Sequence, residues 1–151
     1  MRIIAFDLGK HFAWAWRYQG GTMGIAAGAI ELDGIRSHRM GQLMRLLPPI
    51  MGSGNFDLAA YETPFARGRD ATRSLWGIAG IIEACATNAD VACLDVATPT
   101  IKKFATGHGK ACKEDMIAAA QKFGYRGTNE HEADAVCLLA YAEANAERVY
   151  G

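Results

Sequence analysis

The sequence predicts one α/β domain, residues 1–151, with a mixed five-stranded sheet and helices on both of its faces. Three observations lead to this prediction. Three strand-like segments at the start of the chain are joined by short turns that contain glycine. Two later strand-like segments are each followed by apolar residues at helical spacing. The chain of 151 residues suffices for one hydrophobic core and is short for two.

The first three strands are expected to form an antiparallel meander. Arg2–Leu8 alternates, ends in an aliphatic run and is closed by Gly9. His11–Tyr18 is aromatic and alternating, which is typical of a half-buried strand. Gly20-Gly21 then supplies a second hairpin turn before Thr22–Leu32. Both turns are short enough to place consecutive strands side by side.

The next segment, Arg36–Met51, is predicted to be the first helix. Its apolar residues recur at a spacing of three and four: Met40, Leu43, Met44 and Leu47. Pro48-Pro49 lacks two backbone N–H donors, so this pair is expected to end or interrupt the helix.

The rest of the chain alternates strands with helices. Short apolar runs predict strands over Asp57–Glu62 and Val91–Val96. Helical spacing predicts Asp70–Thr87, Thr98–Phe104, Lys113–Phe123 and a last helix from about Asn129. Thr98 is expected to cap its helix ahead of Pro99, and Glu130 is a possible capping partner of Thr128.

The resulting order is βββαβαβα with one extra short helix. An antiparallel meander followed by crossover units produces a mixed sheet that is covered on both faces. This is the arrangement of the RNase H-like fold.

In this topology, acidic residues from distant parts of the chain meet at one edge of the sheet. Asp7 and Glu62 lie at the ends of strands that can be neighbours, and His131 and Asp134 share one face of the last helix. Separately, Asp7 could cap a turn, Glu62 could pair with Arg67, and His131 could be a surface histidine. Carboxylates without a cationic partner repel one another, whereas divalent cations turn that cost into attraction. Together the four side chains predict a site for two Mg²⁺ ions, with Mn²⁺ able to substitute, suited to phosphodiester hydrolysis.

The charge distribution is compatible with a nucleic-acid partner although the formal net charge is zero. Residues 102–113 contain four lysines and no acid, and residues 63–73 contain three arginines and one acid. Acidic residues gather late, at Glu130, Glu132, Asp134, Glu143 and Glu147. This segregation suits a protein that holds both a phosphate chain and metal cations, but ordinary solvated helix faces would also produce it.

Other classes of protein find no support in the sequence. No apolar run is long enough to span a bilayer and the first residues lack a signal-peptide pattern, so the expected location is the cytoplasm, or the host cytoplasm if the gene is viral. The four cysteines form no CxxC pair, which leaves no zinc knuckle.

Four segments resemble the landmarks of RuvC-type Holliday junction resolvases: MRIIAFDLGK, YETPFARGRDATRSL, TPTIKKFATGHGKACKEDM and NEHEADAVCLLAYA. The most specific are the E-x-P-F run and the IKK-x-x-T-G-x-G-x-A-x-K run. The resemblance extends over nearly the whole chain and suggests a phage or otherwise divergent member.

The resemblance implies roles for individual residues. Asp7, Glu62 and Asp134 correspond to metal-binding carboxylates, while His131 stands where bacterial RuvC usually has aspartate and could be a ligand or a base. Lys113 would neutralise charge developing at the scissile phosphate. The remaining candidates for DNA contact are Phe65, which would stack on bases, and Arg67, Arg69, Arg73, Lys102, Lys103 and Lys110.

The function implied is that of a Mg²⁺-dependent, structure-selective endonuclease that cuts four-way junctions and related branched DNA. Paired cuts on a two-fold substrate suit a homodimer, with Asp70–Thr87 as the expected interface. Two alternatives stay open. One is an RNase H-like nuclease acting on RNA or simpler flaps, and the other is a junction-binding protein without catalysis.

Overall fold

A computed structural model describes residues 1–18, 24–65 and 67–150. The hairpin turn expected at Gly20-Gly21 and the predicted strand start at Thr22 lie outside the described residues. The elements that are described follow the predicted order. None of the helices in the described part of the chain is long and apolar enough to cross a membrane.

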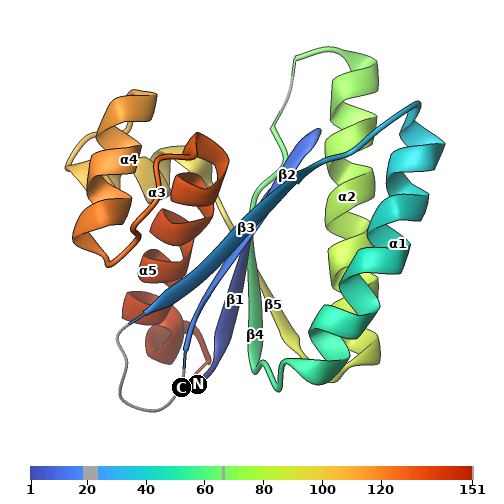
Figure 1. Ribbon diagram of the computed structural model, residues 1–151, viewed down its shortest axis with the longest axis horizontal. Coiled ribbons are helices and arrows are strands. Elements are labelled where there is room, and N and C mark those ends of the chain that lie inside the picture. Colours follow the sequence, from blue (N-terminus) through green and yellow to red (C-terminus); the bar gives the residue numbers. More distant parts are fainter. Residues whose placement is uncertain (19–23, 66, 151) are drawn as a thin grey trace.

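Five strands and five helices make up the described structure (Figure 1). The strands are β1 (Ile3–Asp7), β2 (His11–Arg17), β3 (Ile25–Glu31), β4 (Leu58–Glu62) and β5 (Ala92–Val96). The helices are α1 (Arg36–Ser53), α2 (Arg69–Asn88), α3 (Thr98–Thr106), α4 (Lys113–Lys122) and α5 (Glu130–Tyr150).

The strands form one mixed sheet in the order β3-β2-β1-β4-β5, which confirms the predicted fold class. The pairs β1–β2 and β2–β3 are antiparallel, and the pairs β1–β4 and β4–β5 are parallel. Phe6 of β1 lies opposite Tyr61 of β4. Asp7 and Glu62, the next residues of these two strands, therefore emerge side by side at the same edge.

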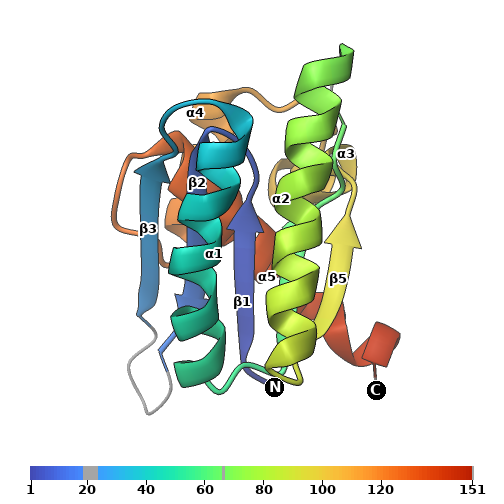
Figure 2. The same cartoon turned by 90° about the vertical axis from the view of Figure 1, so that its right-hand side faces the viewer.

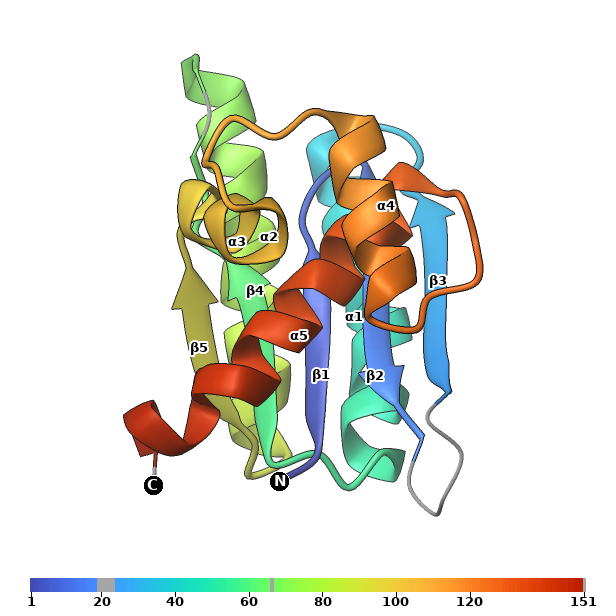
Figure 3. The ribbon, with the colours of Figure 1, turned by 90° about the vertical axis from the view of Figure 1, so that its left-hand side faces the viewer.

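Helices cover both faces of the sheet. Figure 2 shows α1 and α2 on one face, and Figure 3 shows α3, α4 and α5 on the other. Successive side chains of a strand point to opposite faces, and β1 follows this rule, since Ile4 and Phe6 pack in the core beneath α1 and α2. Ile3 and Ala5 belong to the core beneath α5, so Asp7 also points toward α5.

The proline pair in α1 does not end the helix, so the expectation that it would end or interrupt it is wrong. Helix α1 continues through Pro48 and Pro49 to Ser53. Both prolines are exposed, so backbone carbonyls that lose an N–H partner can reach water. Leu47 and Met51 lie in the core on either side of the pair. Packing of this apolar face outweighs the local preference of proline.

Candidate active site

Three carboxylates from three elements gather at the carboxyl end of the central strands. Asp7 ends β1, Glu62 ends β4, and Asp134 comes from the second turn of α5. Asp7 is only 6 % exposed. The structure therefore brings together the residues in which the sequence predicted a metal site.

Burial and mutual repulsion act on these carboxyl groups together. Burial, followed by the charges of Glu62, Asp134 and Glu130, raises the pKa of Asp7 to about 9. Burial and then Asp134 raise the pKa of Glu62 to about 7. Burial raises the pKa of Asp134 to about 6, against the opposing influence of Lys102. Groups whose charged forms are so disfavoured are characteristic of functional sites rather than of structural ion pairs.

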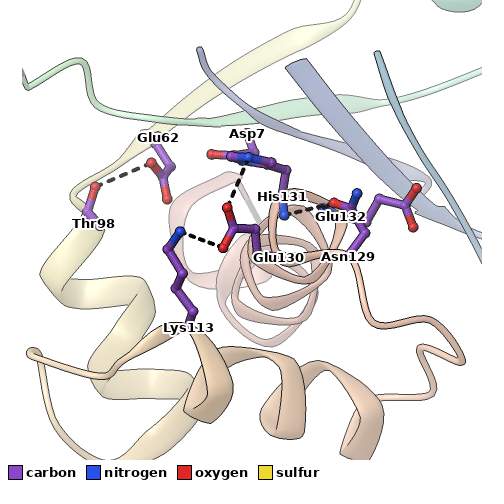
Figure 4. A network of polar contacts seen from close by, with 8 residues as sticks. All are labelled: Asp7, Glu62, Thr98, Lys113, Asn129, Glu130, His131 and Glu132. Atoms are coloured by element: carbon purple, nitrogen blue, oxygen red, sulfur yellow. Dashed lines mark hydrogen bonds and ion pairs between the residues drawn. The ribbon is translucent and has the colours of Figure 1, made fainter. Parts of the chain in front are cut away.

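A chain of polar contacts runs from Asp7 through α5 to α4 (Figure 4). His131 Nδ1 lies 3.1 Å from Asp7 Oδ2, and His131 Nε2 lies 3.3 Å from Glu130 Oε1. Lys113 Nζ lies 2.7 Å from the other oxygen of Glu130, Oε2. One imidazole thus has a carboxyl group at each ring nitrogen, and the outer carboxylate is also paired with a lysine.

The pKa shifts of Asp7, His131 and Glu130 favour one arrangement of protons along this series of contacts. Burial lowers the pKa of His131, so the ring is neutral and carries one N–H. The pKa of Asp7, raised to about 9, favours its protonated form, which can donate to the lone pair of His131 Nδ1 at 3.1 Å. The ring N–H is then at Nε2, which lies 3.3 Å from Glu130 Oε1, and the Lys113 ammonium lowers the pKa of Glu130. The lone pair of Nδ1 faces Asp7, which is the side on which a cation would bind.

The first turn of α5 is held in place by contacts that the sequence pattern did not reveal. Asn129 Oδ1 accepts hydrogen bonds from the backbone N–H groups of His131 and Glu132, at 2.9 and 3.0 Å. Asn129 therefore caps the helix, and Glu130 turns to Lys113 instead of capping with Thr128 as proposed. The ring of His11 stacks on that of His131 with 4.9 Å between centroids.

Glu62 has a partner that sequence reasoning assigned elsewhere. The hydroxyl of Thr98 lies 3.4 Å from Glu62 Oε2 and lowers its pKa against the effect of burial. Thr98 was expected to cap α3, but Ala97 occupies the cap position and Thr98 is already inside the helix. Helix α3 therefore begins without a side-chain cap, and the Thr98 hydroxyl is directed to Glu62 at the end of β4 instead.

The donor set fits a hard divalent cation, although the side chains do not yet surround one. Asp7, Glu62 and Asp134 offer oxygen ligands and His131 offers Nδ1, a set that Mg²⁺ or Mn²⁺ can use. Within the described residues, no three carboxylate, histidine or cysteine side chains converge on a point that could hold a metal ion. Asp7 and Glu62 contact internal partners instead, His131 and Thr98.

A cavity of about 560 Å³ adjoins Glu62. Its lining includes Phe65, Thr98 and Lys102. Phe65 is 84 % exposed, so it does not pack into the core as a structural phenylalanine would. An exposed aromatic ring beside a lysine is compatible with the predicted stacking on a base, whose π-face needs no sequence-specific contact.

The other predicted DNA-contacting residues are exposed around this end of the molecule. Arg67 precedes α2, and Arg69 and Arg73 are exposed on its first turns. Lys103 and Lys110 are exposed on α3 and on the loop after it, and neither is among the residues lining the 560 Å³ cavity. The structure places these five side chains on the surface and leaves their roles as predictions.

The site also contains residues that sequence reasoning did not select: Glu130, Asn129, Thr98 and His11. The sequence places Glu130 in the late acidic stretch and at a possible cap, but not in the site. Its position next to the predicted site residue His131 could have indicated that Glu130 belongs to the site. Its partner Lys113, however, is on another helix, and no spacing within one element reports that contact.

Comparison with known proteins identifies the fold. No protein-family model and no curated protein matches the sequence. Among solved structures, RuvC from Thermus thermophilus is similar with a TM-score of 0.78 and 17 % identity, over 99 % of this chain and 97 % of that one. T. thermophilus RuvC in complex with a Holliday junction substrate gives 0.83 and 18 %, over 99 % and 96 %. The fowlpox virus resolvase in complex with substrate Holliday junction DNA gives 0.59 and 16 %, over 94 % and 99 %. The chain therefore has the RNase H-like fold in the form found in RuvC-type resolvases.

Proposed function

We propose that this protein is a divalent-metal-dependent endonuclease that cleaves four-way junctions and related branched DNA. The observation that carries the proposal is the meeting of Asp7, Glu62 and Asp134 in one cluster, buried at Asp7 and partly buried at the other two, whose charged forms are disfavoured. The fold supports it further, because two structural neighbours were solved with Holliday junction DNA. The expected place of action is the cytoplasm, or that of the host if the gene is viral.

Four side chains would hold the cations: Asp7, Glu62, Asp134 and His131 through Nδ1. Two Mg²⁺ ions bound there would activate the attacking water and stabilise the leaving oxygen. Lys113 and Lys102 both lie close enough to the cluster to lower the pKa of Asp134, and they would neutralise phosphate charge. Thr98 would orient Glu62. Arg67, Arg69 and Arg73 would position the DNA backbone, while Phe65 would stack on an opened base.

The protein is proposed to act as a homodimer through α2. Trp76 is 53 % exposed on this helix, and Gly80, one turn further on, has open space where a Cβ would project. A large exposed ring beside a bare backbone is self-complementary under a two-fold axis, because each ring can cover the glycine of the other copy. Trp76→Asp should give a monomer by light scattering, whereas Tyr18→Asp, at an equally exposed aromatic elsewhere, should leave the mass unchanged.

A cleavage panel tests the proposed reaction. Wild type and Asp7→Asn are incubated with a four-way junction, a flap, a linear duplex and an RNA/DNA hybrid, in Mg²⁺ and in Mn²⁺. We expect wild type to cut the junction preferentially and Asp7→Asn to bind it without cutting. Preferential cutting of the hybrid or the flap would favour the broader RNase H-like function. Junction binding without cutting in both metals would favour a non-catalytic binding protein.

A further inference from the structure

Glu130 occupies a position between two donors that a phosphate could use. Its oxygen Oε2 lies 2.7 Å from Lys113 Nζ and its oxygen Oε1 lies 3.3 Å from His131 Nε2 (Figure 4). The two donors come from different helices, α4 and α5. They contact one carboxylate, each through a different oxygen.

A carboxylate and a phosphodiester present similar acceptor groups to a pair of donors such as Lys113 and His131. Each presents two oxygens on one central atom and carries one negative charge, and both accept charge-assisted hydrogen bonds from lysine. An imidazole N–H donates equally well to either. Glu130 is therefore an internal mimic of the group that the proposed nuclease must bind.

Lys113 and Glu130 are accessible to solvent, so a phosphate could replace the Glu130 carboxylate. The side chain of Lys113 is 71 % exposed and that of Glu130 is 34 % exposed. An ion pair so accessible is weak and is readily replaced by a competing anion. The inner contact is different, because Asp7, which holds the other nitrogen of the same ring, is buried.

We propose that Lys113 Nζ and His131 Nε2 form a binding site for one backbone phosphodiester of DNA, and that Glu130 fills this site in the free protein. His131 then has two separate tasks: Nδ1 faces the carboxylate cluster and Nε2 faces the DNA backbone. Binding of DNA turns the Glu130 carboxylate away and transfers both donors to phosphate oxygens. This inference rests on the proposed function, since it assumes that DNA is the substrate.

Binding measured without divalent metal tests the exchange apart from catalysis. Fluorescence anisotropy compares wild type and Glu130→Gln on a four-way junction and on a linear duplex. Removing the competing charge should tighten binding about two- to fivefold, the range expected for loss of an exposed ion-pair competitor. Glu114→Gln is the matched control, because it removes the same charge from the residue next to Lys113, and it should have a smaller effect.

The Lys113→Ala background separates this exchange from general repulsion. There, Glu130→Gln should tighten binding less than it does in the wild type, because the donor that it would free is absent. An equal gain in both backgrounds, an equal gain in Glu114→Gln, or no gain at all would overturn the proposal. Cleavage by wild type with no effect of Glu130→Gln on binding would reject this inference alone. Failure to bind either DNA would reject the proposed function as well.

Discussion

Helix α5 makes polar contacts with the sheet at two places, and the two differ in kind. In its middle, Glu143 receives two hydrogen bonds of 2.9 Å from Nε and a terminal nitrogen of Arg17 on β2, a two-pronged ion pair. At its start, His131 reaches Asp7 on β1, and the charges that act on Asp7 are those of other carboxylates. The same helix thus carries a satisfied ion pair and a cluster of like charges.

The difference shows which contact stabilises the fold and which one is retained at a cost. The Glu143 carboxylate raises the pKa of Arg17, which means that folding favours the charged pair. At Asp7 the pKa is raised to about 9, which means that folding disfavours the charged form. The ionised carboxylate cluster at Asp7 destabilises the folded protein. Such a cluster is best explained by a bound ligand that offsets its charge.

The largest expected difference between the Asp7 contact and the Glu143 contact is in the rate of junction cleavage. Asp7→Asn should lower the rate of junction cleavage on the order of 10³-fold, because it removes a carboxylate that is proposed to bind metal. Glu143→Gln should leave the rate within about twofold, since Glu143 contacts Arg17 far along the helix. Single-turnover cleavage measures both. Comparable losses in the two variants would remove the distinction drawn here.

The pH dependence of stability sharpens the comparison. In EDTA, native Asp7 keeps a proton that the unfolded chain has lost above its ordinary pKa of 3.8. The free energy of unfolding should therefore fall as pH rises from about 4 to about 9, by at most about 1.4 kcal/mol per pH unit. Chemical denaturation of Asp7→Asn should show a flatter profile and higher stability at pH 8, because an asparagine cannot ionise. Asp90→Asn, a substitution at a positive-φ surface position that asparagine tolerates, should keep the wild-type slope.

Loss of the Arg17–Glu143 ion pair should lower the stability of the protein, whereas loss of the Asp7 carboxyl group should raise it at pH 8. Arg17→Met keeps most of the apolar stem of the side chain and removes the guanidinium, so the protein should lose about 1 kcal/mol of stability. The estimate is modest because both side chains are about one third exposed. Urea unfolding at neutral pH measures the loss. A stabilised Arg17→Met would show that the pair does not hold α5 on β2.

The smallest expected signal is a proton count. A cation bound at Asp7 must displace the proton that the raised pKa keeps there, so Mg²⁺ binding near pH 7.5 should release up to about one proton per chain. Isothermal titration calorimetry in buffers of different ionisation enthalpy measures this number. Asp7→Asn should release fewer protons. Mg²⁺ binding without proton release would contradict the protonation state assigned to Asp7.

Much of the fold and part of the site could be predicted because the relevant signals are local. Alternation in residues 2–8 and a short apolar run in residues 57–62 predict two strands, and their parallel pairing then places Asp7 beside Glu62. The proline pair of α1 shows where such reasoning fails, because burial of Leu47 and Met51 outweighs a local preference. Thr98 shows a second failure, since its hydroxyl bonds Glu62 across elements instead of capping its own helix.

By itself, the sequence determined the order of the elements, the mixed sheet and the edge at which Asp7, Glu62 and Asp134 meet. Only the tertiary structure decided that His131 lies between Asp7 and Glu130, and that Glu130 pairs with Lys113 of α4. The physical reason is that apolar periodicity is a local property of the sequence, whereas polar contacts between elements are not. Apolar periodicity is set within one element, whereas the partner of a polar side chain depends on how closely two packed elements approach. Here small buried residues, Ala5 and Ala13 of the sheet and Ala133 of α5, share one core and allow that close approach.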